Sequence, residues 1–202
     1  MKILILGYSK IVRKRILKVL QANKNKIFVA TKSFKDSIPG IKKKYNCYDK
    51  ALKECKPNLV YISLPNSMHY YWAKKALSHK CHTLVDKPIT MTLFELNDLI
   101  KISNKSKKIL SEATFFNYHS QLIKIKKIFK KTAYKIIDTK FVIPKPNKNS
   151  ILLSKKLGGG VLMDMGPYIS SIPRIFNLKN IINKKVLIKK NNKNLIVSIN
   201  FI

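Results

Sequence analysis

Acidic residues are scarce in this sequence. Its 202 residues include 9 Asp and Glu against 42 Lys and Arg, which gives a formal net charge of +33. Such a charge is typical of proteins that bind nucleic acid or anionic membrane surfaces. The lysines, however, are spread along the whole chain and alternate with apolar residues, as in residues 123–128, instead of gathering in one stripe. We therefore interpret the charge as a compositional bias on solvated faces and predict no specific nucleic-acid partner.

Cysteines and long apolar runs are also few. Cys47, Cys55 and Cys81 are odd in number and lack a CxxC or other metal-ligand spacing, which predicts reduced, structural thiols and no metal site. No run approaches the roughly 18 apolar residues of a membrane span, and the run before Gly7 is too short for a signal-peptide core. The apolar fraction of 46% excludes wholesale disorder. We expect a cytoplasmic protein with no membrane segment.

Glycine is rare as well, and the first of the six closes a strand. The compact apolar run Lys2–Leu6 before Gly7 predicts a buried parallel strand. Apolar residues then recur at helical spacing over residues 12–20, and residues 27–30 form a second apolar run. This order is a βαβ opening, in which a phosphate group fits where the turn meets the helix N-terminus.

The glycine fingerprint of dinucleotide-binding turns is incomplete. Its G-x-G-x-x-G positions read Gly7, Ser9 and Val12, so an ordinary strand-turn-helix explains these residues equally well. Ser9 is small enough for close backbone approach and has a hydroxyl to donate. After the second strand, Lys32 and Ser33 stand where a carboxylate would bind the ribose of NAD. A cation and a hydroxyl suit a 2′-phosphate, which favours NADP.

Strands and helices then alternate regularly up to about residue 114. The pattern predicts strands at residues 59–64, 83–85 and 108–110, and helices at residues 49–55, from 69 and from 93. This alternation is typical of an α/β fold with a doubly wound parallel sheet. His69 opens one of the helices, either facing the cleft at the strand's end or bonded locally, and the residues favour neither alternative.

Asp86, Lys87 and Pro88 follow the strand at residues 83–85. Ligands of open α/β sheets bind outside the carboxyl ends of the strands. The proline ring fixes its own φ and restricts the lysine before it, so Lys87 is a candidate electrophilic or acid catalyst. On local composition alone, one more surface lysine is the commoner explanation.

The second half of the chain has a different pattern. It predicts a helix at residues 120–131, a half-exposed strand at 136–143, a turn at 144–147 and strands at 185–189 and 194–202. Three consecutive glycines, 158–160, indicate close backbone approach or torsions forbidden to other residues. Asp164 and Tyr168 then lie four residues apart on one helical face. An early-turn acid in a core helix is the alternative explanation for Asp164.

Four segments together resemble the Gfo/Idh/MocA family of NAD(P)-dependent oxidoreductases, most closely its glucose-fructose oxidoreductase and dihydrodiol dehydrogenase branch. The four segments are the strand-turn-helix at residues 3–20, the Pro-Asn and following His in 64–69, Asp86-Lys87-Pro88 in place of Glu-Lys-Pro, and the triple glycine with Asp164, Gly166 and Tyr168. Two further pairs, Glu112-Ala113 and His119-x-Gln121, resemble the segment that joins the two domains in this branch.

The resemblance implies a Rossmann domain at residues 1–114, followed by a truncated α+β substrate or dimerisation domain at 115–202. It implies hydride transfer between NADP (or NAD) and a sugar-like or polyhydroxy carbonyl substrate, with a possible homo-oligomer through the C-terminal sheet. The implied catalytic residues are Lys87, which stabilises alkoxide charge, Tyr168, which transfers the hydroxyl proton with a pKa lowered by the lysine, and Asp164, which orients the substrate or the acid/base group. The implied cofactor contacts are Gly7, Ser9, Lys10, Ile11, Lys32, Ser33, Leu64, Pro65, Asn66, His69, Asp86 and Lys87.

The sequence also departs from the family pattern. Asp86 is one methylene shorter than the usual glutamate, and Asn117 and Ser120 stand where the branch has Arg and Pro. The chain is short for the family, so a fragment, a shortened dimerising subfamily and a decaying gene product are all open. A non-catalytic, degenerate nucleotide-binding remnant is therefore the alternative to an active oxidoreductase.

Overall fold

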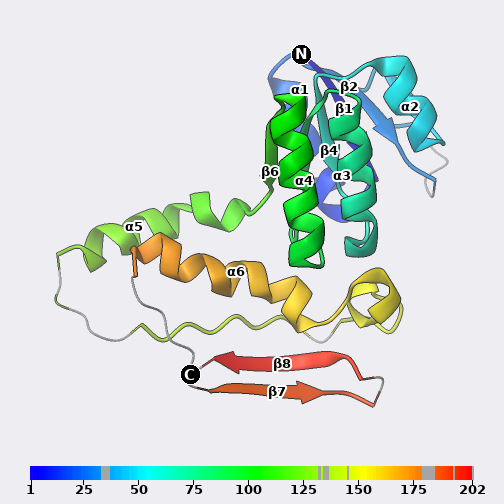
Figure 1. The fold of residues 1–202 in the computed structure, drawn as a ribbon. Helices are drawn as coiled ribbons and strands as arrows, with labels where there is room; N and C mark the ends of the chain where they lie inside the picture. The colour runs from blue at the N-terminus through cyan, green and yellow to red at the C-terminus, as the bar shows by residue number, and fades with distance from the viewer. Residues whose placement is uncertain are drawn as a thin grey trace. The chain divides into compact units, whose positions relative to one another are not determined.

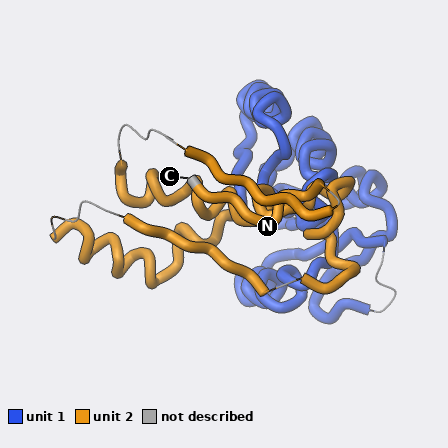
Figure 2. The backbone as a smooth tube through the Cα atoms, turned by 90° about the horizontal axis from the view of Figure 1, so that it is seen from below, with its two compact units in different colours: residues 1–113 blue, residues 114–202 orange. Residues whose placement is uncertain are grey.

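A computed structural model describes residues 1–32, 37–131, 133, 137–144, 146–178, 185–192 and 194–201. The chain divides into two compact units, residues 1–113 and 114–202 (Figure 2). Within the described ranges, no helix is both long enough and apolar enough to cross a membrane.

A six-stranded sheet forms the centre of the first unit, and each pair of neighbouring strands is parallel (Figure 1). The strand order is β3-β2-β1-β4-β5-β6. The chain builds outward from β1 in one direction and then, from β4, in the other. The predicted doubly wound parallel sheet is confirmed, with its topological switch point between β1 and β4. The strands are β1 (Lys2–Leu6), β2 (Lys26–Ala30), β3 (Lys43–Tyr45), β4 (Leu59–Ile62), β5 (His82–Val85) and β6 (Leu110–Glu112).

Helices follow β1, β3, β4 and β5, as the hydrophobic spacing predicted. The α4 helix begins with a capping box, in which Thr92 and Glu95 satisfy each other's backbone N–H groups, and α3 lies beside it (Figure 1). The first helix covers residues 10–22 and contains a π-helical turn. The helical elements are η1 (Val12–Ile16), α1 (Leu17–Ala22), α2 (Tyr48–Cys55), η2 (Asn66–Met68), α3 (His69–Ser78) and α4 (Leu93–Ser106).

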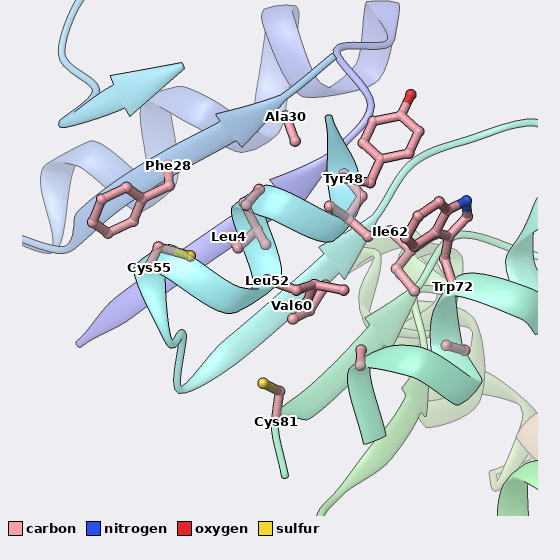
Figure 3. Close-up of a cluster of buried hydrophobic side chains, with 14 of the residues drawn as sticks. Leu4, Phe28, Ala30, Tyr48, Leu52, Cys55, Val60, Ile62, Trp72 and Cys81 are labelled. Carbon is pink, nitrogen blue, oxygen red and sulfur yellow. The ribbon is translucent and has the colours of Figure 1, made fainter. Parts of the chain in front are cut away.

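Both faces of the sheet are buried, and alternate residues of β1 show how. Leu4 and Leu6 pack in a cluster with side chains of α2, α3 and α4, whereas Ile3 and Ile5 pack on the other face with Leu17 of α1. Figure 3 shows the first cluster, where α2 lies across the strands. Full burial of such a side chain stabilises the fold by roughly 1.5–3 kcal/mol, so the near-continuous apolar strands fix the sheet between two helical layers.

Two details of the sheet differ from the prediction. The β3 strand was missed because it is only Lys43–Tyr45, a lysine-rich edge strand with one buried side chain. The last strand covers Leu110–Glu112, two residues later than predicted. The side chain of Glu112, at the carboxyl end of this strand, accepts a hydrogen bond from the backbone N–H of Ile89 at 2.9 Å.

The second unit combines helices with a small antiparallel sheet, so the predicted α+β class is confirmed. The β7 and β8 strands pair with each other, and α6 packs on β8. Its elements are η3 (Phe115–Tyr118), α5 (Ser120–Phe129), η4 (Ile151–Leu153), η5 (Lys155–Leu157), α6 (Val161–Phe176), β7 (Val186–Lys190) and β8 (Ile196–Phe201).

The strand predicted at residues 136–143 is wrong over its described part. Residues 137–144 form no regular strand, and the described strands of this unit, β7 and β8, pair with each other. The apolar alternation instead places Phe141 against Phe116, with ring centroids 5.4 Å apart.

The triple glycine has the backbone properties that the sequence predicted. Gly158 and Gly160 have φ of +77° and +105°, and a Cβ on Gly159 would lie 2.5 Å from the carbonyl oxygen of Leu152. The α6 helix therefore begins directly after a turn that other residues could not form.

Candidate active site

The carboxyl ends of three adjacent strands carry most of the predicted site residues of the first unit. The turn at Gly7 follows β1, residues 63–66 follow β4, and residues 86–88 follow β5. In a parallel sheet these ends share one edge, and here they flank the topological switch point, where such folds bind ligands.

The turn after β1 fits a dinucleotide. Gly7 has φ of +93°, and a Cβ there would lie 2.1 Å from the carbonyl oxygen of Ser63, so only glycine allows this approach. The helix begins at residue 10, which directs its first N–H groups to the edge of the sheet. Lys10 and Ile11 are exposed in that first turn, and Val12 is buried in the layer between helix and sheet.

Ser9 occupies the second glycine position without blocking the turn. Its hydroxyl lies 2.7 Å from that of Ser63 and 3.3 Å from the backbone nitrogen of Val12, whose N–H it accepts. Ser63 in turn donates to Asp86 at 2.5 Å, and Tyr61 donates to the other oxygen of the same carboxylate. Sequence reasoning missed Ser63 and Tyr61. A polar residue directly after the buried strand β4 is the signal that could have identified Ser63.

The segment around Lys87 is anchored by neighbouring elements on both sides. Asp86 is bonded to Tyr61 of β4 and to Ser63 directly after it, and the backbone N–H of Ile89 donates to Glu112 of β6 at 2.9 Å. His69 of α3 lies 2.7 Å from the carbonyl oxygen of Pro88 through its Nδ1 atom. The Lys87–Pro88 peptide is cis, and the lysine side chain is half-buried. Lys87 is thus carried by a segment whose backbone is fixed before and after it.

His69 itself is fully buried at the start of α3. Its second ring nitrogen, Nε2, lies 2.8 Å from the carbonyl oxygen of Leu64. Both ring nitrogens thus face backbone carbonyls, one five residues before His69 and one 19 residues after it, so only one of these contacts is local. Leu64, Pro65 and Asn66 are half-buried at the carboxyl end of β4 and the start of η2.

The residues predicted to select the cofactor lie after β2. Lys32 is exposed, and its Nζ atom lies 5.7 Å from the centre of the Tyr48 ring at the start of α2. This distance is within the range of a cation–π interaction. Burial raises the pKa of the Tyr48 phenol, so the ring stays neutral. Ser33 lies outside the described residues.

In the second unit, the structure places Asp164 and Tyr168 one turn apart on α6. Asp164 is in the first turn of the helix, where a negative charge is favourable, and it lines a largely apolar cavity of about 410 Å³ with residues of β8. The Tyr168 ring packs against Phe116 and Phe141, with centroids 5.5 and 5.7 Å away. Near this cluster in the sequence, the Oδ1 atom of Asn117 is buried and has no hydrogen-bond partner among the described residues.

A family model matches residues 1–114, the part of the chain that holds the sheet and the anchored lysine. Its description is an oxidoreductase family with an NAD-binding Rossmann fold. The chain belongs to the Gfo/Idh/MocA family. The resemblance that the sequence motifs suggested is confirmed.

Individual relatives agree with this assignment. An uncharacterized oxidoreductase, ORF334, of Rhizobium meliloti is 31% identical over 132 residues, which are 64% of this chain and 40% of that protein. A dTDP-3,4-didehydro-2,6-dideoxy-alpha-D-glucose 3-reductase of Streptomyces violaceoruber is 28% identical over 60% of this chain and 36% of its own. This chain thus spans well under half the length of these curated relatives.

The fold is also similar to that of a solved structure. KijD10, a 3-ketoreductase from Actinomadura kijaniata in complex with NADP and TDP-benzene, superposes with a TM-score of 0.88 at 21% identity. The match covers all of this chain and 65% of that one.

Proposed function

We propose that the protein is an oxidoreductase that transfers a hydride between NADP(H) and a sugar-like or polyhydroxy carbonyl substrate. The observation that carries this proposal is the anchored segment of Lys87. It follows β5 at the edge of the sheet where the Gly7 turn also lies, beside the switch point between β1 and β4. A cation held at this place is suited to stabilising negative charge that develops on a reacting oxygen.

Residues 1–114 are the proposed dinucleotide-binding domain. The bound cofactor supplies the hydride, and the residues around it bind and orient it. Backbone N–H groups of Ser9, Lys10 and Ile11 at the helix N-terminus face the phosphates, and Lys32 selects the 2′-phosphate of NADP. The remaining proposed contacts are Gly7, Ser33, Leu64, Pro65, Asn66 and Lys87, and Asp86 shapes the site through the residues that it bonds. The NADP in the KijD10 complex supports this choice of cofactor.

The two units supply different proposed catalytic groups. Lys87 in the first unit donates a hydrogen bond to the reacting oxygen. In the second unit, the proposed substrate domain at residues 115–202, Tyr168 passes the proton of the substrate hydroxyl and Asp164 orients the substrate. Phe116 and Phe141 pack against the Tyr168 ring and hold it in place. The position of its hydroxyl group is thereby restricted.

The proposed substrate class is a sugar or a nucleotide-activated keto sugar. The keto-sugar reductase among the relatives and the TDP-benzene in the KijD10 complex support it.

A cytoplasmic setting and a homo-oligomer belong to the same proposal. Exposed apolar side chains on β7 and β8, among them Leu187, Ile188 and Val197, support self-association through this sheet. Light scattering over a range of protein concentrations tests it.

Titration with NADPH and NADH, followed by nicotinamide fluorescence at moderate salt, is the first test. Saturable binding that survives added salt, with a preference for NADPH, is the expected result. A panel of sugars and keto sugars is then screened with wild type, Lys87→Ala and the exposed control Lys53→Ala of α2. Turnover lost only in Lys87→Ala supports the enzyme. Binding without turnover across the panel favours the non-catalytic nucleotide-binding alternative, and no binding refutes both.

A further inference from the structure

A chain of hydrogen bonds joins the ends of three strands in the first unit. Ser9 in the turn after β1 bonds Ser63 after β4 at 2.7 Å, and Ser63 bonds Asp86 after β5 at 2.5 Å. Tyr61 of β4 bonds the second oxygen of Asp86. The link therefore extends from the proposed phosphate-binding turn to the residue directly before Lys87.

The donors and acceptors in this chain have one consistent direction. Ser63 has a single hydroxyl hydrogen and donates it to Asp86, so it accepts from Ser9. Ser9 thereby uses its own hydrogen, while its oxygen accepts the backbone N–H of Val12. The single hydroxyl hydrogen of Ser9 is therefore directed at Ser63 and not outward from the turn.

Burial makes this chain strong. The side chains of Ser63 and Tyr61 are almost inaccessible to water. Burial, and after it the charge of Asp86, raises the pKa of the Tyr61 phenol, so that phenol remains a donor. Hydrogen bonds to a carboxylate are roughly twice as strong as those between neutral groups, so Asp86 is the group that orders the two hydroxyls.

We propose that Asp86 is a positioning residue for the cofactor turn: acting through Ser63 and Ser9, it holds the residues after Gly7 in the form that receives the cofactor's phosphates. This proposal rests on the proposed function, because it explains how the turn that is proposed to bind the cofactor's phosphates keeps its conformation. It also gives a reason for serine at the second glycine position, since the side chain is turned toward Ser63 and leaves the face of the turn open. The carboxylate adjoining Lys87 thus acts on the phosphate-binding turn as well.

A double-mutant cycle on NADPH affinity tests the proposal. Asp86 and Ser9 are the two ends of the chain of hydrogen bonds, and Ser63 links them. We expect Asp86→Asn and Ser9→Ala each to raise the Kd for NADPH about tenfold, as loss of a charge-assisted bond or its relay would. The double variant should be no weaker than the weaker single variant, because both break one path.

Substitutions at Ser63 interrupt the same chain of hydrogen bonds without removing a charge, and they serve as the test if Asp86→Asn folds poorly. Ser63→Ala should match the loss in Ser9→Ala, and Ser63→Thr, which keeps the hydroxyl, should restore most of the affinity. A general loss of stability would not follow the hydroxyl in this way. Matched controls are Ser103→Ala, which removes a hydroxyl bonded to the Lys108 carbonyl, and Asp98→Asn, a carboxylate that accepts from Tyr70 and Lys74. Both should keep the wild-type Kd.

The outcomes separate this inference from the proposed function. If wild type binds NADPH but the two losses multiply to about a hundredfold in the double variant, Asp86 contacts the cofactor independently and the inference is wrong. If Asp86→Asn or Ser63→Ala leaves the Kd unchanged, the inference is also wrong while the proposed function stands. If wild type binds neither NADPH nor NADH, the proposed function fails and the inference fails with it.

Discussion

The Nδ1 atom of His69 lies 2.7 Å from the carbonyl oxygen of Pro88, a residue 19 positions away. The ring is fully buried, and its other nitrogen lies 2.8 Å from the Leu64 carbonyl. One imidazole therefore ties the segment after β4 to the segment that carries Lys87. Its effect on the lysine is exerted through the backbone of Pro88.

His69→Leu should slow turnover more than it weakens cofactor binding. The substitution removes the donor from a buried carbonyl, which costs about 1–3 kcal/mol of stability, and it loosens the segment next to Lys87. A misplacement of about 1 Å can cost roughly a hundredfold in rate. We expect kcat to fall at least tenfold with the Kd for NADPH changed by less than threefold. Stopped-flow kinetics and fluorescence titration measure the two quantities.

Two further variants at histidines sharpen this prediction. His69→Gln keeps an N–H donor and should recover part of the lost kcat, whereas His79→Leu, at an exposed histidine bonded to the Lys75 carbonyl, should behave as wild type. Equal losses in His69→Leu and His69→Gln would contradict a role for the hydrogen bond.

Gly7→Ala should abolish cofactor binding. The added Cβ would lie 2.1 Å from the Ser63 carbonyl oxygen at φ of +93°, so the turn or the end of β4 must move. Positive φ alone costs a non-glycine residue roughly 1–3 kcal/mol. Gly166→Ala in α6 is the matched control, because its Cβ would meet only a Leu162 side-chain atom at 3.5 Å. NADPH titration of both variants, with circular dichroism to show folding, provides the measurement. Normal affinity in Gly7→Ala would remove this turn from the site.

Lys32→Asp should reverse the cofactor preference. The exposed lysine, 5.7 Å from the Tyr48 ring centre, is proposed to bind the 2′-phosphate, which NADH lacks. We expect the Kd for NADPH to rise about tenfold or more, as loss of a charge-assisted bond implies, while the Kd for NADH stays within about threefold. Equal losses for both cofactors would show that Lys32 does not discriminate between them.

The sheet of the first unit could be predicted because its core strands are nearly continuous apolar runs. Lys2–Leu6 was predicted with the bounds that the structure shows. The edge strand β3 could not be predicted, since Lys43 and Lys44 give no apolar signal and only pairing with β2 makes them a strand. The opposite error occurred at Phe141, where apolar alternation served packing against Tyr168 and not a strand.

The site was predicted as a set of residue types, not as a set of bonds. The motif at residues 86–88 identified the position of Lys87 on the sheet edge, but nothing in the local sequence connects Asp86 with Ser63 or His69 with Pro88. Asp86 and Ser63 are 23 positions apart in the sequence, and His69 and Pro88 are 19 positions apart. These bonds depend on the strand order, which brings β4 and β5 together.

Alkaline pH should destabilise the first unit through Cys55. Burial, and after it the neighbouring Cys81, raises the pKa of the Cys55 thiol to about 11. The folded state therefore holds this proton more tightly than the unfolded chain, whose thiol titrates near about 8.5. The stabilisation is fully present below that value and is lost as pH rises toward 11. Tyr61, with a pKa raised by burial and by Asp86, acts in the same direction.

Urea unfolding of wild type and Cys55→Ala at pH 8, 9.5 and 11 measures this contribution, with the exposed Cys47→Ala as control. The many lysines also titrate in this range, but all three chains share them, so differences at equal pH isolate the thiol. The stability lead of wild type over Cys55→Ala should shrink as pH rises, because the variant lacks the group that must lose its proton. A constant difference between wild type and Cys55→Ala would show that Cys55 does not titrate with an altered pKa in the folded state.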